Sequence, residues 1–400
     1  MNRLRILTVL LAVVLFASCD NTLKDVPEKY HALLNTAFEK AGENAKELKA
    51  AMNQVPVAQK EGMAFLISYM PERDLTTLKA DFLVENSELA YGAREKYSWC
   101  KQLPDSIFFN EVLPYVSFNE TREKWRADFV KRFAPYVEKC TNLRQAIDSI
   151  NKNIKTIVEV EYNTKREKPD QSPFESMRQH MASCTGLSIL LTDAFRAVGI
   201  PSRIAGTPLW TNMRGNHNWC EVWIDGTWYF TEYYPDKLDH SWFLSDAGKA
   251  DPKKPLHWIY ASSWKSTGIS FPLVWDENIK YVPAENVTDR YIRLYQEQLT
   301  DNGLGEDEMI ANVILFKKNQ CTQDGNQRVA AQVRVKNQKG KKISWGYTPS
   351  ATDDMNKFLK FKLKKNTKYT FVFPGVGAMD KEFTVKTGKD AEEMIKLYQE

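Results

Sequence analysis

One cysteine and one histidine form a pair that could carry out nucleophilic chemistry. Cys184 follows Ser183 and begins a run whose apolar residues recur at helical spacing as far as Val198. At a helix N-terminus the dipole and the exposed backbone N–H groups favour a thiolate and can also hold an oxyanion. His217 follows 33 residues later (217 − 184), and an imidazole is a suitable base for a thiol. The sequence therefore predicts a cysteine nucleophile with a histidine base.

A carboxylate is placed to orient this histidine. Residues 217–224 alternate as a strand, residues 228–232 as a returning strand, and an Asp-Gly pair between them is typical of a two-residue hairpin turn. The start of one strand lies opposite the end of its hairpin partner, so we expect Glu232 near His217. A carboxylate there accepts the imidazole N–H and stabilises the charged ring. Asp236 is the nearest alternative carboxylate in the sequence.

Each of these residues also has a structural interpretation when it is considered alone. A cysteine at a helix start is commonly a small buried residue, and a strand histidine or a strand-end carboxylate needs no function. Signatures of other chemistries are missing from the sequence, namely GxSxG, HExxH, CxxC, a phosphate-binding glycine loop and a dinucleotide fingerprint. The five histidines are scattered, so we expect no metal centre, and no motif indicates a cofactor.

The order of the motifs resembles the transglutaminase-like core. The matching pieces are Cys184, Gly-Ile-Pro-Ser-Arg at 199–203, His-x-Trp-x-Glu-Val at 217–222 and Asp-Gly-x-Trp at 225–228, with an acid four residues on. The similarity covers roughly residues 174 to 245. It implies a papain-like Cys-His-Asp triad on an α+β scaffold, with Cys184 as nucleophile and His217 as base. The family usually has Asp at the third position, whereas this chain has Glu232, one methylene longer, so the geometry must differ.

The first residues indicate export and lipid attachment. Two arginines precede an apolar run from Ile6 to Phe16, and small residues then lead to Cys19. A run this short cannot cross a bilayer as a mature span, so it predicts a cleavable signal over residues 1–18. The segment resembles the lipobox of bacterial lipoproteins, which implies that Cys19 is acylated. The protein would then be anchored by lipid in the bacterial cell envelope, at the outer membrane, facing the periplasm or the cell surface. The alternative is an ordinary signal peptide that ends by chance in cysteine.

The rest of the chain predicts three domains. The net charge of +4 over 400 residues includes no basic stripe, so nothing indicates a nucleic-acid partner. Helical apolar spacing predicts a helical domain over 19–160, and one helix mixed with strands predicts the transglutaminase-like domain over 161–298. Alternating apolar residues predict a small antiparallel β-sandwich over 299–400. The predicted fold class is therefore α+β.

Tryptophans gather around the predicted site. Eight of the eleven tryptophans fall between residues 210 and 275. This is more than the core of one domain is expected to need, so it predicts an aromatic cleft wall that binds extended peptides or sugar rings by stacking. Core packing would account for about half of them. The candidate substrate-binding residues are Trp210, Trp219, Trp258 and Trp264.

Other residues near the pair have predicted supporting roles. Cys220 falls on the strand face opposite His217, so we expect it in the core, and we expect Arg203 in a buried ion pair or bonded to backbone carbonyls. By analogy with papain-like enzymes Gln179 is a candidate oxyanion donor, with an ordinary surface glutamine as the alternative. Apart from Cys19 the cysteines number five, so at least one is a free thiol, and Cys100 with Cys140 is the one pair considered for a disulfide.

Two classes of function follow from these features. The first is an exported thiol enzyme that acts on peptide or carboxamide bonds through a thioester on Cys184. Water is a less demanding acceptor than a second amine, so hydrolysis as a peptidase or amidase is favoured over cross-linking. Its partners would be peptides, proteins or cell-wall peptides, with the membrane contacted through the N-terminal lipid. The alternative, suggested by Glu232, is a catalytically weak or inactive scaffold lipoprotein that holds peptides or glycans in an aromatic cleft.

Overall fold

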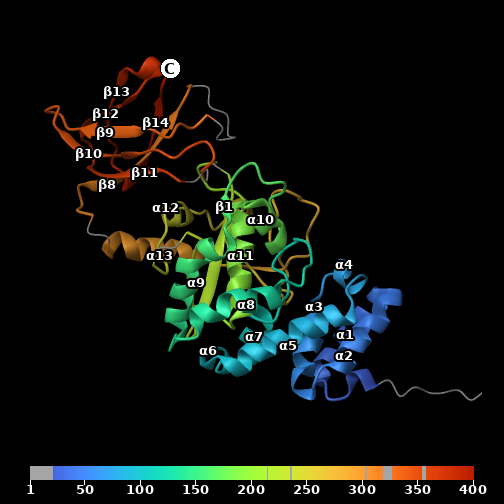
Figure 1. Cartoon of the computed structure of the whole chain (residues 1–400). Coiled ribbons are helices and arrows are strands. Elements are labelled where there is room, and N and C mark those ends of the chain that lie inside the picture. The colour runs from blue at the N-terminus through green and yellow to red at the C-terminus, as the bar shows by residue number, and fades with distance from the viewer. Residues whose placement is uncertain (1–20, 214, 235–236, 302–303, 319–326, 354–356) are drawn as a thin grey trace, which may run out of the picture.

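A computed structural model describes residues 21–213, 215–234, 237–301, 304–318, 327–353 and 357–400 of the chain. Figure 1 shows helices at the N-terminal end, a mixed region in the middle and two sheets at the C-terminal end. The predicted signal segment with Cys19, and also Asp236 and Cys321, lie outside the described residues. No helix in the described ranges has the length and apolar character that a membrane span requires.

The N-terminal half is helical. Its helices are α1 (His31–Ala41), α2 (Ala45–Gln54), α3 (Lys60–Tyr69), α4 (Glu72–Leu75), α5 (Ala80–Lys96), α6 (Ser98–Lys101), α7 (Asp105–Glu111), α8 (Trp125–Val137) and α9 (Leu143–Val158). Short 3-10 turns lie at Asn21–Leu23, Glu28–Tyr30, Gly42–Asn44 and Val57–Gln59. The sequence sets the ends of some of these helices, as in α9, where the Asn142 side chain accepts a hydrogen bond from the backbone N–H of Gln145 at 3.0 Å.

The middle region is built on a five-stranded antiparallel sheet. Its strand order is β5-β4-β3-β6-β7, with β3 (Ser202–Thr207), β4 (His217–Ile224), β5 (Thr227–Thr231), β6 (Tyr260–Ser262) and β7 (Ala284–Asn286). Helix α11 (Cys184–Ala197) packs on β4 and β3 and is buried from Thr185 to Ala197. Most of the buried residues of this helix are apolar, as expected of a helix that is covered on every side, but Asp193 is buried with neither carboxylate oxygen hydrogen-bonded to a described residue. The remaining elements are β1 (Glu161–Tyr162), α10 (Pro173–Gln179), β2 (Met181–Ala182), α12 (Leu244–Ala247), α13 (Thr288–Asp301) and a 3-10 turn at Pro255–His257.

The helical region and the middle region share one hydrophobic core. Helices α8, α9 and α5 pack on α11, and a single cluster of buried residues extends from Val26 to Trp264. Two buried arginines link the same parts. Arg126 on α8 donates to the carbonyl of Arg196 at 3.1 Å, and Arg196 on α11 donates to the carbonyl of Val116 at 3.1 Å. Packing is therefore continuous across residue 160, where the sequence predicted a boundary.

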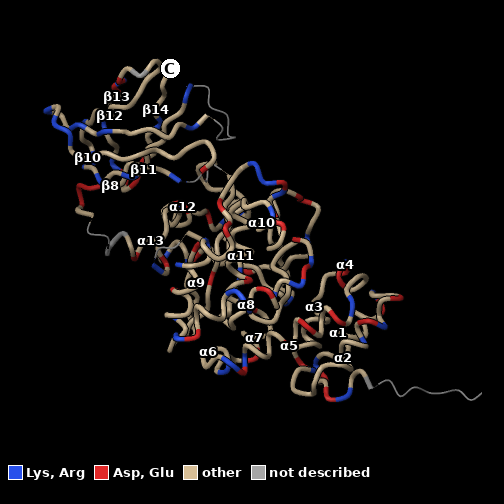
Figure 2. Tube along the Cα trace, viewed as in Figure 1, with Lys and Arg blue, Asp and Glu red and all other residues tan. Residues whose placement is uncertain are grey.

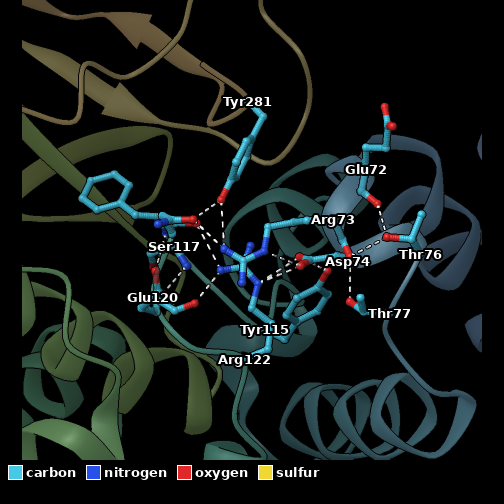
Figure 3. A network of polar contacts seen from close by, with 12 residues as sticks. Glu72, Arg73, Asp74, Thr76, Thr77, Tyr115, Ser117, Glu120, Arg122 and Tyr281 are labelled. Carbon is cyan, nitrogen blue, oxygen red and sulfur yellow. Dashed lines mark hydrogen bonds and ion pairs between the residues drawn. The ribbon is translucent and has the colours of Figure 1, made fainter. Parts of the chain in front are cut away.

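A polar network around Asp74, a buried acid on helix α4, makes a further link between the helical region and the middle region (Figure 3). Asp74 is 1% exposed and accepts hydrogen bonds from Arg122 Nε at 2.9 and 3.0 Å and from the Tyr115 hydroxyl at 2.9 Å. The neighbouring Arg73 donates to Tyr281 at 3.2 Å. This network joins α4, the segment that precedes α8 and the loop after β6. Elsewhere Figure 2 shows both signs of charge interspersed along the described chain.

The C-terminal region is a two-sheet sandwich. One sheet has the antiparallel order β10-β9-β12-β13, with β9 (Gln332–Lys336), β10 (Lys342–Tyr347), β12 (Lys368–Pro374) and β13 (Asp380–Lys386). The other has the order β11-β8-β14, with β8 (Glu308–Phe316), β11 (Leu359–Lys364) and β14 (Glu392–Tyr398). A 3-10 turn lies at Val376–Ala378. Inward residues of both sheets, such as Val333 and Phe361, form a separate core, as alternation predicts.

The predicted α+β class is confirmed, with one difference in the sandwich. Strand β14 pairs with β8 in parallel, whereas the sequence predicted antiparallel pairing throughout. The reason is that the chain crosses from β13 in one sheet to β14 in the other. A connection of this kind, unlike a tight hairpin, permits a parallel neighbour.

The disulfide considered for Cys100 and Cys140 is wrong. Both cysteines are free, as are Cys184 and Cys220 among the described cysteines. Cys100 packs against Gly199, where an added Cβ would lie 2.7 Å from the Cys100 Cβ atom, and Gly199 has a φ of +71°. Glycine is needed at that turn for both reasons. Cys140 lies instead beyond α8, with its Sγ 3.8 Å from the carbonyl oxygen of Tyr136.

A buried glutamate on α7 should make stability depend on pH. Burial raises the pKa of Glu111 to about 7, although Arg203 and Arg196 oppose this shift. The unfolded chain ionises near the ordinary pKa of about 4.3. Glu111 therefore contributes stability that is complete below about pH 4.3 and is lost as the pH rises through about 7.

We predict that Glu111→Gln removes this dependence, because glutamine keeps the acceptor for Asn110 without the ionisation. Between about pH 4.5 and 7 the free energy of unfolding should decrease with rising pH, and the decrease should be roughly 3 kcal/mol larger in the wild type than in the variant. Denaturant titrations at several pH values measure this. The exposed Glu95→Gln is the matched control and should leave the profile unchanged. A Glu111→Gln profile parallel to that of the wild type would contradict the prediction.

Candidate active site

Cys184 lies at the first turn of α11, as predicted. Ser183 precedes the helix, and its hydroxyl accepts from the backbone N–H of Gly186 at 3.1 Å and donates to the carbonyl of Pro169 at 2.5 Å. This cap fixes where the helix begins. Cys184 is half-buried, in contrast with the fully buried Cys220. Cys184 is therefore the first residue of the helix, in the turn whose backbone N–H groups have no partners within the helix.

His217 begins strand β4 and meets the predicted carboxylate. Its Nε2 atom is 2.9 Å from Oε1 of Glu232, which follows the last residue of β5. The hydroxyl of Ser241 donates to the other carboxylate oxygen of Glu232. The last pair of the β4–β5 ladder is Cys220 with Thr231, so Glu232 lies just beyond the paired residues and its side chain extends along β4 to His217. Both oxygens of this longer side chain are held.

Cys184, His217 and Glu232 line one pocket. Four aromatic side chains contribute to the rest of its wall, and one lysine comes from the C-terminal region. These further lining residues include Trp219, Tyr233, Tyr234, Trp242 and Lys357. A partly apolar hollow with a few converging polar groups is the usual form of a small-molecule or peptide subsite.

A buried hydrogen bond links the two elements that carry the reactive pair. Asn218 Nδ2, next to His217, donates to Thr185 Oγ1, next to Cys184, at 2.7 Å. On the same face of β4 the Cys220 thiol donates to the carbonyl of Ser188 at 3.3 Å, and burial raises the pKa of Cys220 to about 12. Cys220 is thus a core residue, as predicted. The start of α11 and the start of β4 are therefore held together by direct contacts.

The opposite face of β4 rests on a buried cluster of charges. Glu221 is fully buried, and it accepts from Arg203 Nε at 2.8 Å, from the Tyr291 hydroxyl at 2.8 Å and from Arg290. Burial opposes ionisation, but the two arginines hold the pKa of Glu221 below its ordinary value. The buried ion pair predicted for Arg203 is present. Tyr291 also accepts from Trp219 Nε1 at 2.6 Å, which ties the pocket wall to the same cluster.

The four candidate tryptophans occupy different environments. Trp219 lines the pocket, and Trp210 stacks behind it with ring centroids 6.1 Å apart. Trp258 donates to the carbonyl of Pro252 at 2.8 Å, and Trp264 donates to the carbonyl of Leu66 at 3.2 Å, in contact with the N-terminal helices. Trp210, Trp258 and Trp264 are not among the residues that line this pocket. Trp264 follows β6, where the chain turns toward the helical region, whereas Trp210 is buried in the core behind Trp219.

Gln179 lies on the surface, in agreement with the ordinary alternative. Its side chain exchanges two hydrogen bonds with Glu167, at 3.1 Å from the backbone N–H and 2.9 Å to the carboxylate. Sequence reasoning missed Ser241, Trp242, Asn218, Thr185 and Lys357. Asn218 and Thr185 could have been suspected as polar neighbours of the reactive pair. Trp242 is one of the eight tryptophans between residues 210 and 275.

Residues 131–233 match the family model of the transglutaminase-like superfamily. The matched segment begins within α8 and ends one residue after Glu232, so it contains α11, strands β3 to β5 and all three residues of the predicted triad. This chain therefore carries a transglutaminase-like domain, as the motif order indicated.

Three solved structures illustrate what the chain resembles. A candidate cysteine protease from Cytophaga hutchinsonii has 20% identity, with 27% of this chain and 37% of that chain covered at a TM-score of 0.24. The TIE protein of Bacillus anthracis has 14% identity, 49% and 30% coverage and a TM-score of 0.16. Red sea bream transglutaminase has 10% identity, 66% and 58% coverage and a TM-score of 0.26. The chain thus covers less than two thirds of each of these proteins. No curated protein matches it.

The bond between Asn218 and Thr185 yields a test of how the site is positioned. Thr185→Val keeps the shape of the side chain but leaves a buried amide without its acceptor, which costs about 1–3 kcal/mol. We expect the rate of Cys184 alkylation by iodoacetamide to change by about tenfold, since small displacements at a reactive centre have large effects. Mass spectrometry of the modified peptide measures the rate.

Thr192→Val is the matched control. Thr192 is a buried threonine of the same helix that contacts Cys220 at 3.3 Å and does not line the pocket. It should lower stability without altering the labelling of Cys184. Equal labelling rates in the two variants would show that the Thr185 bond does not position the thiol.

Proposed function

We propose that the protein is a thiol enzyme that hydrolyses peptide or carboxamide bonds, with Cys184 as nucleophile, His217 as base and Glu232 as the orienting acid. The observation that carries the proposal is the 2.9 Å contact between His217 and Glu232 inside a pocket that Cys184 also lines. The matched transglutaminase-like model, which covers all three residues, supports the same assignment.

The proposed reaction has two half-reactions. His217 takes the thiol proton as the sulfur of Cys184 attacks the carbonyl carbon, and backbone N–H groups at the start of α11 stabilise the oxyanion. The C–N bond then breaks, the amine leaves with the proton from His217, and a thioester remains. In the second half-reaction water adds, again with His217 as base, and the acid and the free thiol are released.

The two nitrogens of the His217 ring have different roles in this proposal. Glu232 accepts a hydrogen bond from Nε2, so proton exchange with Cys184 uses Nδ1 in this proposal. The negative charge stabilises the imidazolium that forms in each half-reaction. Ser241 fixes the second oxygen of the carboxylate and thereby restricts its rotation.

A binding protein without turnover is the second candidate. Glu232 in place of the usual Asp favours it, and so does an aromatic wall that includes Trp219 and Trp242. Such a wall could hold a peptide or a glycan by stacking. The two candidates differ in whether the thiol is activated and in whether bound peptides are cleaved.

We predict that Cys184 is alkylated before Cys100 and Cys220, because Cys184 lines the pocket and the other two thiols are buried. Burial raises the pKa values of Cys100 and Cys220 to about 12, so these two serve as internal controls. Glu232→Gln should lower turnover of a peptide library by up to about four orders of magnitude, nearly as far as Cys184→Ala, because the imidazolium loses its counter-charge.

Ser241→Ala should have a smaller effect than Glu232→Gln, since it loosens the carboxylate but leaves its charge. Turnover is measured by mass spectrometry of the peptides, and alkylation by mapping of the modified cysteines. If Cys184 labels no faster than Cys140 and no peptide is cleaved, the binding protein is the better account. Unchanged turnover in Glu232→Gln would instead remove Glu232 from the mechanism.

We also propose that Cys19 is acylated and anchors the mature protein in the bacterial cell envelope. The support is the order of the charged, apolar and small residues that precede Cys19. Cys19→Ala should move the protein from the membrane fraction to the soluble fraction and abolish incorporation of labelled palmitate. Persistent membrane association of this variant would place the anchor elsewhere.

A further inference from the structure

The C-terminal sandwich contributes a lysine to the active-site pocket. Lys357 lies two residues before strand β11 and lines the pocket together with Cys184 and His217. Its side chain is half-buried, and its Nζ atom is 4.4 Å from the ring centroid of Tyr234. A cation above an aromatic face keeps much of its charge available to other partners. The pocket is thus formed by two parts of the chain.

Contacts between the two parts fix where this lysine lies. Lys360 Nζ donates to the carbonyl of Trp242, itself a pocket residue, at 3.0 Å. Further from the pocket, Lys249 is 3.1 Å from Glu392 on β14, and Glu392 also accepts from Asn312 at 3.1 Å. Figure 1 shows β11 on the side of the sandwich that faces α12. The bond from Lys360 holds the start of β11 beside the pocket.

The charges in the pocket indicate what this lysine is available to bind. Glu232 is the other charged side chain among the described lining residues, and both of its oxygens are engaged, by His217 and by Ser241. Within the described part of the chain no carboxylate pairs with Lys357. An ammonium group that lines the same pocket as Cys184, with no carboxylate partner among the described residues, favours an anionic group on the molecule that enters.

We propose that Lys357 determines specificity by binding a carboxylate of the substrate next to the bond that Cys184 attacks. The inference rests on the proposed thiol enzyme and names its substrate class, a peptide with a carboxylate beside the scissile carbonyl. That carboxylate is either the C-terminal α-carboxylate or the side chain of Asp or Glu. Both sources present the same charge to the lysine.

Two small alkylating reagents test the charge preference without any knowledge of the substrate. Iodoacetate carries a carboxylate and iodoacetamide is neutral. The rate of Cys184 alkylation by iodoacetate divided by the rate with iodoacetamide therefore reports how strongly the pocket favours an anionic reagent. In Lys357→Gln this ratio should fall about fivefold, the effect expected from one partly exposed ion pair. The wild-type ratio should also fall as salt is added, because ions screen the attraction.

Two variants control this measurement. Lys357→Arg keeps the charge and should preserve the ratio. Lys396→Gln makes the matched change at an exposed lysine of β14 that does not line the pocket, and it should also preserve the ratio. An equal ratio in the wild type and in Lys357→Gln overturns the inference.

Peptides separate the two sources of the carboxylate. One pair of peptides differs only in a free or amidated C-terminus, and a second pair differs only in Glu or Gln next to the cleaved bond. The pair that the wild type distinguishes, and that Lys357→Gln no longer distinguishes, identifies the source. An active enzyme that distinguishes neither pair overturns the inference.

The failure of the proposed enzyme would look different. In that case Cys184 labels slowly with both reagents and no peptide is cleaved, yet the ratio of the two rates can still be measured at higher reagent concentration. A ratio that falls in Lys357→Gln then supports an anion-binding pocket without turnover. A ratio that does not change overturns the role of Lys357 in either case.

Discussion

The packing of α11 across β4 is the constraint on which the site depends. Cys184 is at one end of the helix and His217 at one end of the strand, so their separation is set by how these two elements cross. The hydrogen bond from Asn218 to Thr185 fixes that crossing next to the reactive pair, and the contact between Cys220 and Ser188 repeats it one turn further along the helix. Because side chains alternate along a strand, a slip of one residue in β4 would exchange His217 for its neighbour.

The other face of β4 shows why the strand cannot shift easily. Glu221 is buried among two arginines and Tyr291, and a charge in such a place is tolerable only when every partner is in position. Movement of the strand would separate the carboxylate from these partners and leave it desolvated. The strand that carries His217 is thus fixed by apolar packing and hydrogen bonds to α11 on one side and by buried charges on the other. Such support from both sides holds a reactive side chain in one geometry.

The parts of this arrangement that the sequence predicted are local ones. Apolar spacing identified α11, and the hairpin predicted at Asp225-Gly226 brought Glu232 near His217, because both features depend on residues close together in the chain. Ser241 and Lys357 could not be predicted, since they reach the site through a loop and through a separate domain. Trp264 lies in a region rich in tryptophan, but composition does not show that it packs against the N-terminal helices. Cys100 and Cys140 share a helical region, and only the three-dimensional arrangement shows that one faces Gly199 and the other a different turn.

The glutamate in the third position is best understood through its two partners. A glutamate has one more rotatable bond than an aspartate, and holding it in one rotamer costs up to about 1–2 kcal/mol of side-chain entropy. The hydrogen bond from Ser241 contributes about 1 kcal/mol in return and removes the freedom that the extra methylene introduces. The carboxylate then meets His217 at 2.9 Å with both oxygens fixed, which is what an orienting acid requires. Length alone is therefore a weak reason to regard this chain as inactive, and the presence of Ser241 beside Glu232 is a physical reason to expect the longer side chain to serve.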